Sequence, residues 1–291
     1  MERFIALFSS GVADGAIDAI AALGFLVIFK ASGVVNFAQG DLITLAAYVA
    51  VWFQTDHKVP WYWTYPIVIV IMALVGMMLE RIAVAPLRKR PVFVVVIATL
   101  GAALAIRSGI LQWQGSDPVS LSSPLTGKLL HVGGAVISYQ RVAIVVVTVL
   151  VIGLMLWMFS RTSLGRELRA VASDPEMARV YGIRTNRLSL VAWAISGMLA
   201  GVAAILIGPL GAIDSTLGFN VMLTGFAAAV LGGFGNLKGV AVAGLLLGLV
   251  HQLLGGYLLQ NYKDVYPFVL LVLVIAVRPE GLFASDDRAR V

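Results

Sequence analysis

The sequence predicts an all-α integral membrane protein with roughly eight or nine transmembrane helices. Hydrophobic residues make up 60% of the chain and charged residues 12%, whereas soluble domains carry about 25% charged residues. Apolar runs of roughly 20 residues recur along the whole chain, and each is long enough to cross about 30 Å of hydrocarbon as a helix. Because the alternating pattern of a β-barrel is absent, the spans are expected to be helical.

Nine apolar segments are expected to cross the bilayer, or eight if one short segment is re-entrant. We expect the first to be retained, since its apolar run is too long for a cleaved signal and no clean cleavage site follows. The chain is therefore interpreted as one transmembrane domain over 1–291, with a polar external loop at 112–140 and a cytoplasmic loop at 161–187. The expected spans are 4–29, 36–54, 63–80, 91–111, 140–160, 188–209, 219–235, 239–258 and 264–278.

The distribution of basic residues predicts the orientation. If the helices alternate, fifteen Lys and Arg residues fall on one side and five on the other. Since cytoplasmic loops carry such an excess, the central loop and the C-terminus are expected in the cytoplasm and the N-terminus outside. The pI of about 9.7 then reflects topology, and no nucleic acid is expected as a partner. The fifteen are Lys30, Arg81, Arg88, Lys89, Arg90, Arg161, Arg166, Arg169, Arg179, Arg184, Arg187, Lys238, Arg278, Arg288 and Arg290; the five are Arg3, Lys58, Lys128, Arg141 and Lys263.

Two glycine-containing breaks interrupt the apolar pattern, one in each half of the chain. The first, at 33–40, precedes the second span, and the other, at 232–236, precedes the eighth. Irregular backbone at membrane depth is tolerated where it is buried in protein or lines a cavity, and paired breaks are typical of inverted-repeat transporters. We therefore predict an inverted repeat with broken or half helices. The polar or close-packing residues of the breaks, assigned to a translocation path, are Asn36, Gln39, Gly40 and Asn236.

Charged residues inside the predicted spans are conspicuous, because an unassisted charge at mid-bilayer costs about 2.5–3.5 kcal/mol. Asp14 and Asp18 lie four residues apart on one helix face. Arg107 lies toward the outer end of its span and is expected either to reach one of them or to extend to the interface. Two interpretations of the aspartates stay open: a polar lining for the solute path, or structural ion pairing.

Glycine pairs spaced four residues apart predict close helix packing, because each pair puts two small residues on one helix face. Packing inside one subunit is favoured over a subunit interface. The pairs are Gly11 with Gly15, Gly197 with Gly201, and Gly244 with Gly248.

The central loop carries the signals of a short helix over 175–181. Asp174 suits the N-cap, Pro175 the first helical position, and Glu176 the positive end of the helix dipole. Gly182 can end the helix in the left-handed conformation. Such a helix could dock on another protein, although an ordinary solvated loop is the alternative.

Catalytic and metal-binding groupings are missing from the sequence. There is no cysteine, the histidines are scattered, and no HExxH, GxSxG or acidic metal cluster occurs. The string GGFGNLKG lacks the spacing of a phosphate loop and has no Ser or Thr after Lys238. We therefore expect a transport subunit that is not an enzyme, with no cofactor or metal of its own.

Four motifs, in the family's order, closely resemble the LivH-type permeases of ABC importers for branched-chain amino acids and related compounds. The resemblance runs from about 11 to 283, nearly the whole chain. The motifs are FKASGVVNFAQGDLITLAAYV, GRELRAVASDPEMARVYGI, GFAAAVLGGFGNLKGVAVAGLLLGL and RPEGLF.

The resemblance implies a permease in a bacterial or archaeal plasma (inner) membrane. Its implied partners are a LivM-type sister permease, two cytoplasmic ATPases of the LivG and LivF type that bind ATP and Mg²⁺, and an extracytoplasmic solute-binding protein. It also implies that the central loop contacts an ATPase and that 175–181 is the coupling helix. The residues assigned to that coupling are Gly165, Arg166, Arg169, Asp174, Pro175, Glu176, Met177, Ala178 and Gly182.

Two departures from the family pattern bear on the solute. Asp14 and Asp18 stand where an apolar residue and a Tyr are common, and Thr224 and Gly225 stand where a Lys often precedes the aromatic Phe226. An acidic pair would favour a solute with a cationic or hydrogen-donating group, and related systems carry urea, short amides or aromatic acids. The alternative functions are a self-sufficient secondary transporter or channel, which the central loop disfavours, and a membrane-embedded enzyme.

Overall fold

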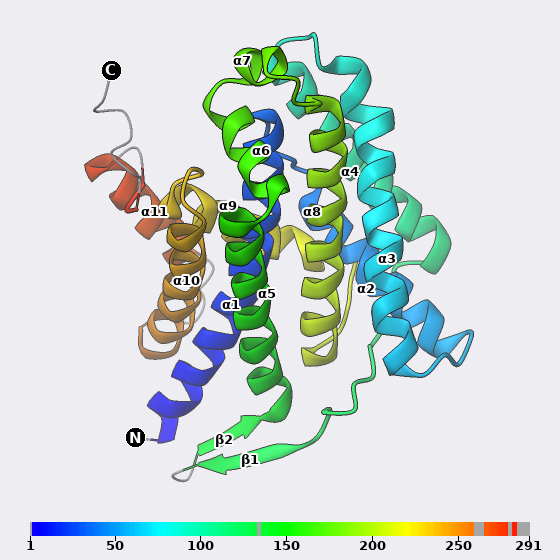
Figure 1. Ribbon diagram of the computed structural model, residues 1–291. Helices are drawn as coiled ribbons and strands as arrows, with labels where there is room; N and C mark the ends of the chain where they lie inside the picture. Colours follow the sequence, from blue (N-terminus) through cyan, green and yellow to red (C-terminus); the bar gives the residue numbers. More distant parts are fainter. Residues whose placement is uncertain (1, 133–134, 259–264, 279–280, 284–291) are drawn as a thin grey trace.

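The structure is a bundle of helices with one short β-hairpin at the end where the chain begins (Figure 1). It is a computed structural model and describes residues 2–132, 135–258, 265–278 and 281–283. The predicted all-α membrane fold is confirmed, because six of the described helices are long and apolar enough to cross a membrane. These are α1 (Glu2–Ser32), α3 (Trp61–Leu79, continued by two short turns to Leu87), α4 (Val92–Gln114), α5 (Tyr139–Arg161), α8 (Thr185–Ile207) and α10 (Leu237–Tyr257).

Three further helices occupy predicted spans but are shorter: α2 (Gln39–Thr55), α9 (Leu217–Gly232) and α11 (Tyr266–Val277). The third predicted span ends differently from the sequence expectation. After α3 the helix widens into a π turn over Glu80–Val84 and tightens into a 3-10 turn over Ala85–Leu87. The buried Glu80 of this turn accepts a hydrogen bond from Ser189 of α8 at 3.0 Å. The π turn therefore brings a carboxylate onto α8.

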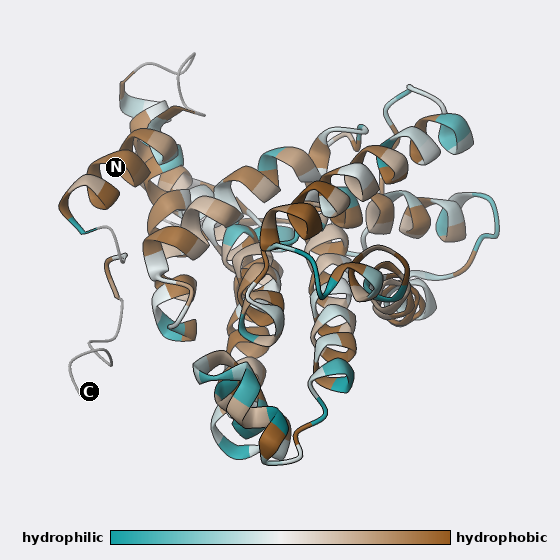
Figure 2. Cartoon of the chain, turned by 90° about the horizontal axis from the view of Figure 1, so that it is seen from above, coloured by the Kyte–Doolittle hydropathy of each residue, from teal (hydrophilic) through white to brown (hydrophobic). Residues whose placement is uncertain are grey.

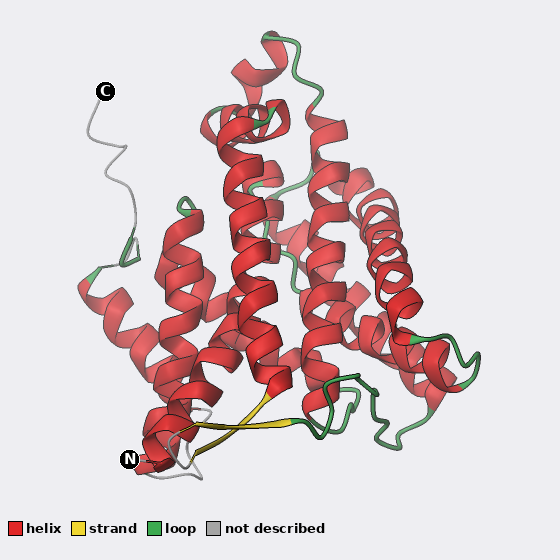
Figure 3. Cartoon of the chain, turned by 60° about the horizontal axis from the view of Figure 1, so that its bottom comes forward, coloured by secondary structure: helices red, strands yellow, loops and turns green. Residues whose placement is uncertain are grey.

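The polar loop between α4 and α5 contains a hairpin that the sequence analysis did not include. Strands β1 (Leu129–Val132) and β2 (Ala135–Ser138) pair antiparallel and lead into α5 (yellow in Figure 3). The signal was present, since the β-branched residues Val132, Val136 and Ile137 surround a Gly-Gly pair in the sequence. A second part of this loop, Val119, pairs with Ile213 in the α8–α9 connection.

Helix α1 forms the centre of the bundle. It packs against α5, α8, α9 and α10, while α3 packs against α8 and α2 packs against α8 and α9. Most of α1 is buried, whereas α3, α4 and α5 are largely exposed and carry many exposed Val, Leu and Trp side chains. Apolar residues cover the helices and hydrophilic ones gather at their ends and in loops (Figure 2). A helix that is apolar all round suits a membrane, so we interpret the outer helices as lipid-facing.

The glycine pairs pack within the chain, as predicted. A Cβ atom on Gly248 of α10 would lie 2.1 Å from the backbone nitrogen of Gly15 in α1. A Cβ atom on Gly197 of α8 would lie 2.1 Å from the carbonyl oxygen of Met72 in α3. These approaches are possible only because the positions lack side chains.

The short helices α2 and α9 begin side by side in the interior. The backbone nitrogen of Gly218 donates to Thr44 Oγ1 at 3.0 Å, and a Cβ atom on Gly40 would lie 2.4 Å from the carbonyl oxygen of Gly218. The chain enters α2 from the end that carries the central loop, through 33–38, and enters α9 from the opposite end, through 211–216 (Figure 1). Opposite entry of two short helices is the arrangement that an inverted repeat requires; the repeat itself stays a prediction.

Candidate functional site

The central loop folds into two helices, α6 (Ser163–Ser173) and α7 (Pro175–Val180), which lie at one end of the bundle (Figure 1). We call this end the α7 end. The capping prediction for α7 is confirmed: Asp174 Oδ1 accepts the backbone N–H groups of Glu176 at 2.9 Å and Met177 at 3.0 Å. Gly182 follows with φ of +83°, a conformation that favours glycine. The sequence analysis did not predict the preceding helix α6 as a separate element.

The residues assigned to coupling divide into an exposed set and a packed set. Gly165 lies against α5, where a Cβ atom would come within 2.5 Å of Phe159 Cα. Arg169 donates to the carbonyl oxygen of Phe159, so both residues hold α6 onto α5. Ala178 is buried and seats α7. The exposed members are Arg166, Arg169, Asp174, Pro175, Glu176, Met177 and Gly182, and of these Arg169 also holds α6 through its hydrogen bond.

Helix α7 presents an apolar surface that no described part of the chain covers. Met177 is 50% exposed, Val180 77% and Tyr181 79%. Together these three residues form what we call the α7 patch. Solvated loops seldom expose three large apolar side chains together, whereas contiguous exposed apolar residues mark interaction sites.

The predicted path residues of the first break form a buried hydrogen-bond network. Asn36 Oδ1 accepts the backbone N–H of Ala38 at 3.0 Å, and Gln39 Oε1 accepts from Ser196 Oγ at 2.7 Å. Gln39 Nε2 donates to the carbonyl oxygen of Ser196 at 3.3 Å. Both side chains are fully buried, and Gln39 ties the break to α8. Gly40 lies at the contact between α2 and α9 already described.

Asn236 makes its hydrogen bonds with other residues than Asn36 does. Asn236 caps α10, accepting the backbone N–H groups of Lys238 and Gly239 at 3.1 Å each, and donates to the carbonyl oxygen of Phe283 at 2.8 Å. The two breaks are linked through an aromatic ring of α9. The ring centroid of Phe37, in the first break, lies 5.7 Å from that of Phe226 in α9, which lies 6.2 Å from that of Phe234 in the second break.

Asp14 and Asp18 line a cavity of about 310 Å³ between α1, α9, α10 and α11. Thr224 Oγ1 donates to Asp18 Oδ1 at 2.5 Å, and Gln252 Nε2 donates to Asp14. Asp18 is buried, and Asn220 and His251 add polar groups to the wall. Both aspartates lie near the middle of the 31-residue helix α1, which puts the cavity within the apolar part of the bundle.

Arg107 pairs with a different carboxylate from the two considered in the sequence analysis. Its Nε lies 2.9 Å from Oδ1 of Asp41, in the first turn of α2, and its guanidinium carbon lies 5.3 Å from the ring centre of Phe219 in α9. Of the two alternatives for Arg107, contact with Asp14 or Asp18 is therefore wrong. Asp41 was not predicted as the partner of Arg107 because it lies at the polar start of a predicted span. Only the folded structure brings α4 beside that turn.

Arg107→Gln is expected to lower the free energy of unfolding by about 3–5 kcal/mol, because it leaves Asp41 buried without its counter-charge. The measurement is reversible unfolding of the purified chain in mixed micelles. The double variant Asp41→Asn with Arg107→Gln removes both charges and should recover most of the loss. Equal stability of Arg107→Gln and the parent would show that the ion pair does not hold α2 and α4 together.

Comparison with known proteins agrees with this architecture. Residues 7–276 match the family model described as "Branched-chain amino acid transport system / permease component". The chain is 31% identical to the high-affinity branched-chain amino acid transport system permease protein BraD of Pseudomonas aeruginosa, over 97% of this chain and 96% of that protein. It is 32% identical to LivH of Escherichia coli K12, over 99% of this chain and 98% of the relative. A probable LivH of Methanocaldococcus jannaschii is 28% identical over 91% of this chain and 88% of the relative.

Proposed function

The chain belongs to the family of permease components of branched-chain amino acid transport systems, and on that premise we propose that it forms the membrane path of an ATP-driven importer. The proposed solutes are branched-chain amino acids or related small compounds such as amides, urea or aromatic acids. The relatives that match over nearly their full length carry the branched-chain amino acid description. The energy comes from partner ATPases, which hold the ATP and Mg²⁺, because the chain carries no nucleotide-binding motif.

The α7 patch is the observation that carries the proposal. An importer permease without an ATPase domain needs a rigid surface through which a partner can move it. Helix α7 is capped by Asp174 and seated by Ala178, while Met177, Val180 and Tyr181 remain exposed. We assign this patch to an ATPase subunit of the LivG or LivF type, which places the α7 end in the cytoplasm and the N-terminus outside, in the plasma (inner) membrane.

The charge distribution supports this orientation. Lys30, Arg88, Arg90, Arg169 and Arg179 all lie around one cavity at the α7 end, and basic residues accumulate on the cytoplasmic side. Three basic residues of the positive-inside count, Lys263, Arg288 and Arg290, lie outside the described residues. The C-terminus and two residues of the RPEGLF motif also lie outside them. A LivM-type sister permease and an extracytoplasmic solute-binding protein complete the proposed assembly.

We assign the Asp14–Asp18 cavity to the solute path. The two departures from the family pattern meet there, since Thr224 donates to Asp18. A buried carboxylate with one hydroxyl partner retains free acceptor capacity. The cavity is therefore suited to a solute that presents a cationic or hydrogen-donating group.

Asp18→Asn is expected to reduce uptake of such a solute about tenfold, the effect of losing roughly 1.4 kcal/mol of interaction. Uptake should be compared between amine- or amide-bearing solutes and analogues without the donor, and Asp14→Asn is expected to act in the same direction. The external Asp117→Asn, outside the cavity, is the matched control. Unchanged rate and solute range in both variants, with lower yield alone, would make the aspartates structural.

A self-sufficient secondary transporter remains the second candidate, because paired short helices with touching first turns also suit that class. Purification of the tagged chain from its native membrane in mild detergent separates the two. Co-purification of two ATPases and a second permease, identified by mass spectrometry, is expected. Isolation of the chain alone, with uptake retained in ATP-free proteoliposomes under an ion gradient, would favour the secondary transporter.

A further inference from the structure

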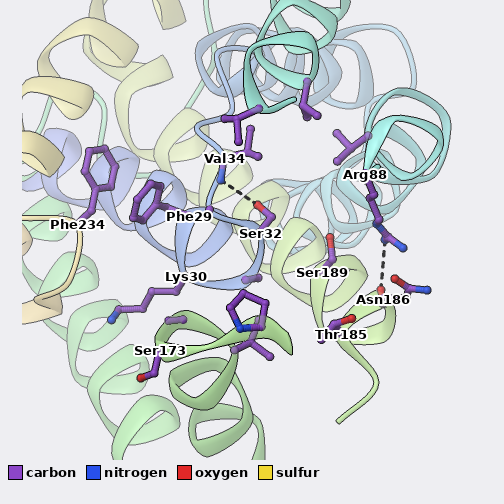
Figure 4. A pocket seen from close by; sticks show the side chains of 18 of the residues that line it. Phe29, Lys30, Ser32, Val34, Arg88, Ser173, Thr185, Asn186, Ser189 and Phe234 are labelled. Carbon is purple, nitrogen blue, oxygen red and sulfur yellow. Dashed lines mark hydrogen bonds between the residues drawn. The ribbon is translucent and has the colours of Figure 1, made fainter. Parts of the chain in front are cut away.

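A cavity of about 600 Å³ lies at the α7 end of the bundle. Its wall is formed by the end of α1, the turn between α3 and α4, helices α6 and α7, the start of α8 and the second glycine break (Figure 4). The lining includes Lys30 of α1, Pro175 of α7 and Ser189 of α8. A group bound here would contact α7 and the membrane helices at once.

The wall is strongly basic. Five basic residues line it, and no Asp or Glu is among the described residues that define it. Arg88 is compensated by an ion pair with the buried Glu80 nearby. The five are Lys30, Arg88, Arg90, Arg169 and Arg179.

The other four basic residues have no ion pair among the described residues. Arg169 donates to a carbonyl oxygen, and Arg179 Nε donates to Thr185 Oγ1 at 3.3 Å, both neutral acceptors. The described contacts give Lys30 and Arg90 no carboxylate partner, since the two ion pairs among the described residues involve neither. Four unmatched positive charges around one cavity attract an anion of more than one charge.

The chemistry of the wall distinguishes this cavity from the solute path. A zwitterionic amino acid would bring an ammonium group into a space without an acidic wall, and a single carboxylate would leave most of the charge unmatched. A phosphate group carries several acceptor oxygens, and Arg is suited to bind them through its forked N–H donors. Basic pockets between transmembrane helices on the cytoplasmic side bind phospholipid headgroups.

We propose that this cavity binds a phosphate-type polyanion, which links α7 to the ends of α1 and α8. The anion is supplied either by the headgroup of an anionic phospholipid or by a free phosphate compound. A bound anion would restrict the movement of α7 relative to α1 and α8. It would thereby change how strongly a displacement of the central loop is transmitted to the membrane helices. The binding site itself does not depend on the transported solute, whereas the lipid source rests on the proposed cytoplasmic position of the α7 end.

The test measures binding of two probes to the purified full-length chain at low salt. Inorganic pyrophosphate represents the free source, and nanodiscs with phosphatidylglycerol, compared with phosphatidylcholine alone, represent the lipid source. At least one probe is expected to bind. The double variant Lys30→Gln with Arg90→Gln should weaken that binding about 30-fold, since each basic residue contributes about fivefold near a charged surface.

Lys89→Gln is the matched control, because Lys89 adjoins Arg90 in sequence, is exposed and does not line the cavity. It should change binding less than twofold. Arg90→Gln alone, at an exposed turn, should weaken binding about fivefold even if the double variant folds poorly. Binding of pyrophosphate identifies a free phosphate compound, and binding of phosphatidylglycerol alone identifies a lipid. Absence of binding for both probes, or an equal loss in Lys89→Gln and Arg90→Gln, would overturn the proposal.

Discussion

Met177→Asp is expected to reduce ATP-driven uptake about 30-fold or more while the chain remains folded and inserted. Met177 lies in the α7 patch and is 50% exposed, so an aspartate there is tolerated in the free chain. At an interface with an ATPase it would bury an unpaired charge, and loss of one central contact can weaken binding by 2 kcal/mol or more. The measurement is uptake into cells or proteoliposomes, normalised to the amount of chain in the membrane.

Glu176→Lys should reduce uptake in the same way, because it places a positive charge in the first turn of α7. Glu167→Lys makes the same charge reversal on an exposed position of α6 and should leave most uptake intact. Normal ATP-driven uptake in both α7 variants would remove α7 from the coupling mechanism. An equal loss in Glu167→Lys would mean that the whole loop, and not α7, forms the contact.

Gly248→Val is expected to prevent stable folding, with the yield of monodisperse protein in detergent falling about tenfold or more. A Cβ atom at this position would lie 2.1 Å from the nitrogen and 2.3 Å from Cα of Gly15. Both neighbours are backbone atoms of the central helix, so α1 and α10 would have to separate. Overpacking a well-packed core typically destabilises by 1–3 kcal/mol, and loss of the α1–α10 contact adds to that.

Gly153→Val in α5 is the control, because a Cβ atom at Gly153 would meet nothing within 4 Å. Its size-exclusion profile and thermal midpoint should stay close to those of the parent. A monodisperse Gly248→Val protein with the parent's midpoint would contradict the close packing of the two helices.

Local signals were the most predictable part of this chain. Asp174, Pro175 and Gly182 determine α7 through capping and backbone conformation, which depend only on neighbouring residues. The glycine pairs predicted which helix faces approach, although not that Gly248 would meet Gly15. The hairpin was not predicted because its strands are short and lie in a loop that is polar in composition.

Contacts between distant polar residues could not be predicted in the same way. The sequence offers several carboxylates within the apolar spans as partners for Arg107. Its actual partner, Asp41, is evident only from the structure, which places α4 beside α2. Asn236 resembled Asn36 in sequence context, yet one caps a helix and the other is fully buried. The contact between Asp18 and Thr224 joins residues far apart in sequence, and it brings both departures from the family pattern into one cavity.

Crosslinking from α7 shows whether this helix contacts an ATP-binding subunit in the membrane. The chain contains no cysteine, so Met177→Cys introduces a unique thiol on the α7 patch. A short thiol-directed crosslinker is applied to native membranes, and the product is identified by mass spectrometry, with Lys128→Cys in the opposite loop as the control. We expect Met177→Cys, and not Lys128→Cys, to be joined to an ATP-binding subunit. Crosslinking of Met177→Cys to no such subunit, in membranes that retain ATP-driven uptake, would contradict it.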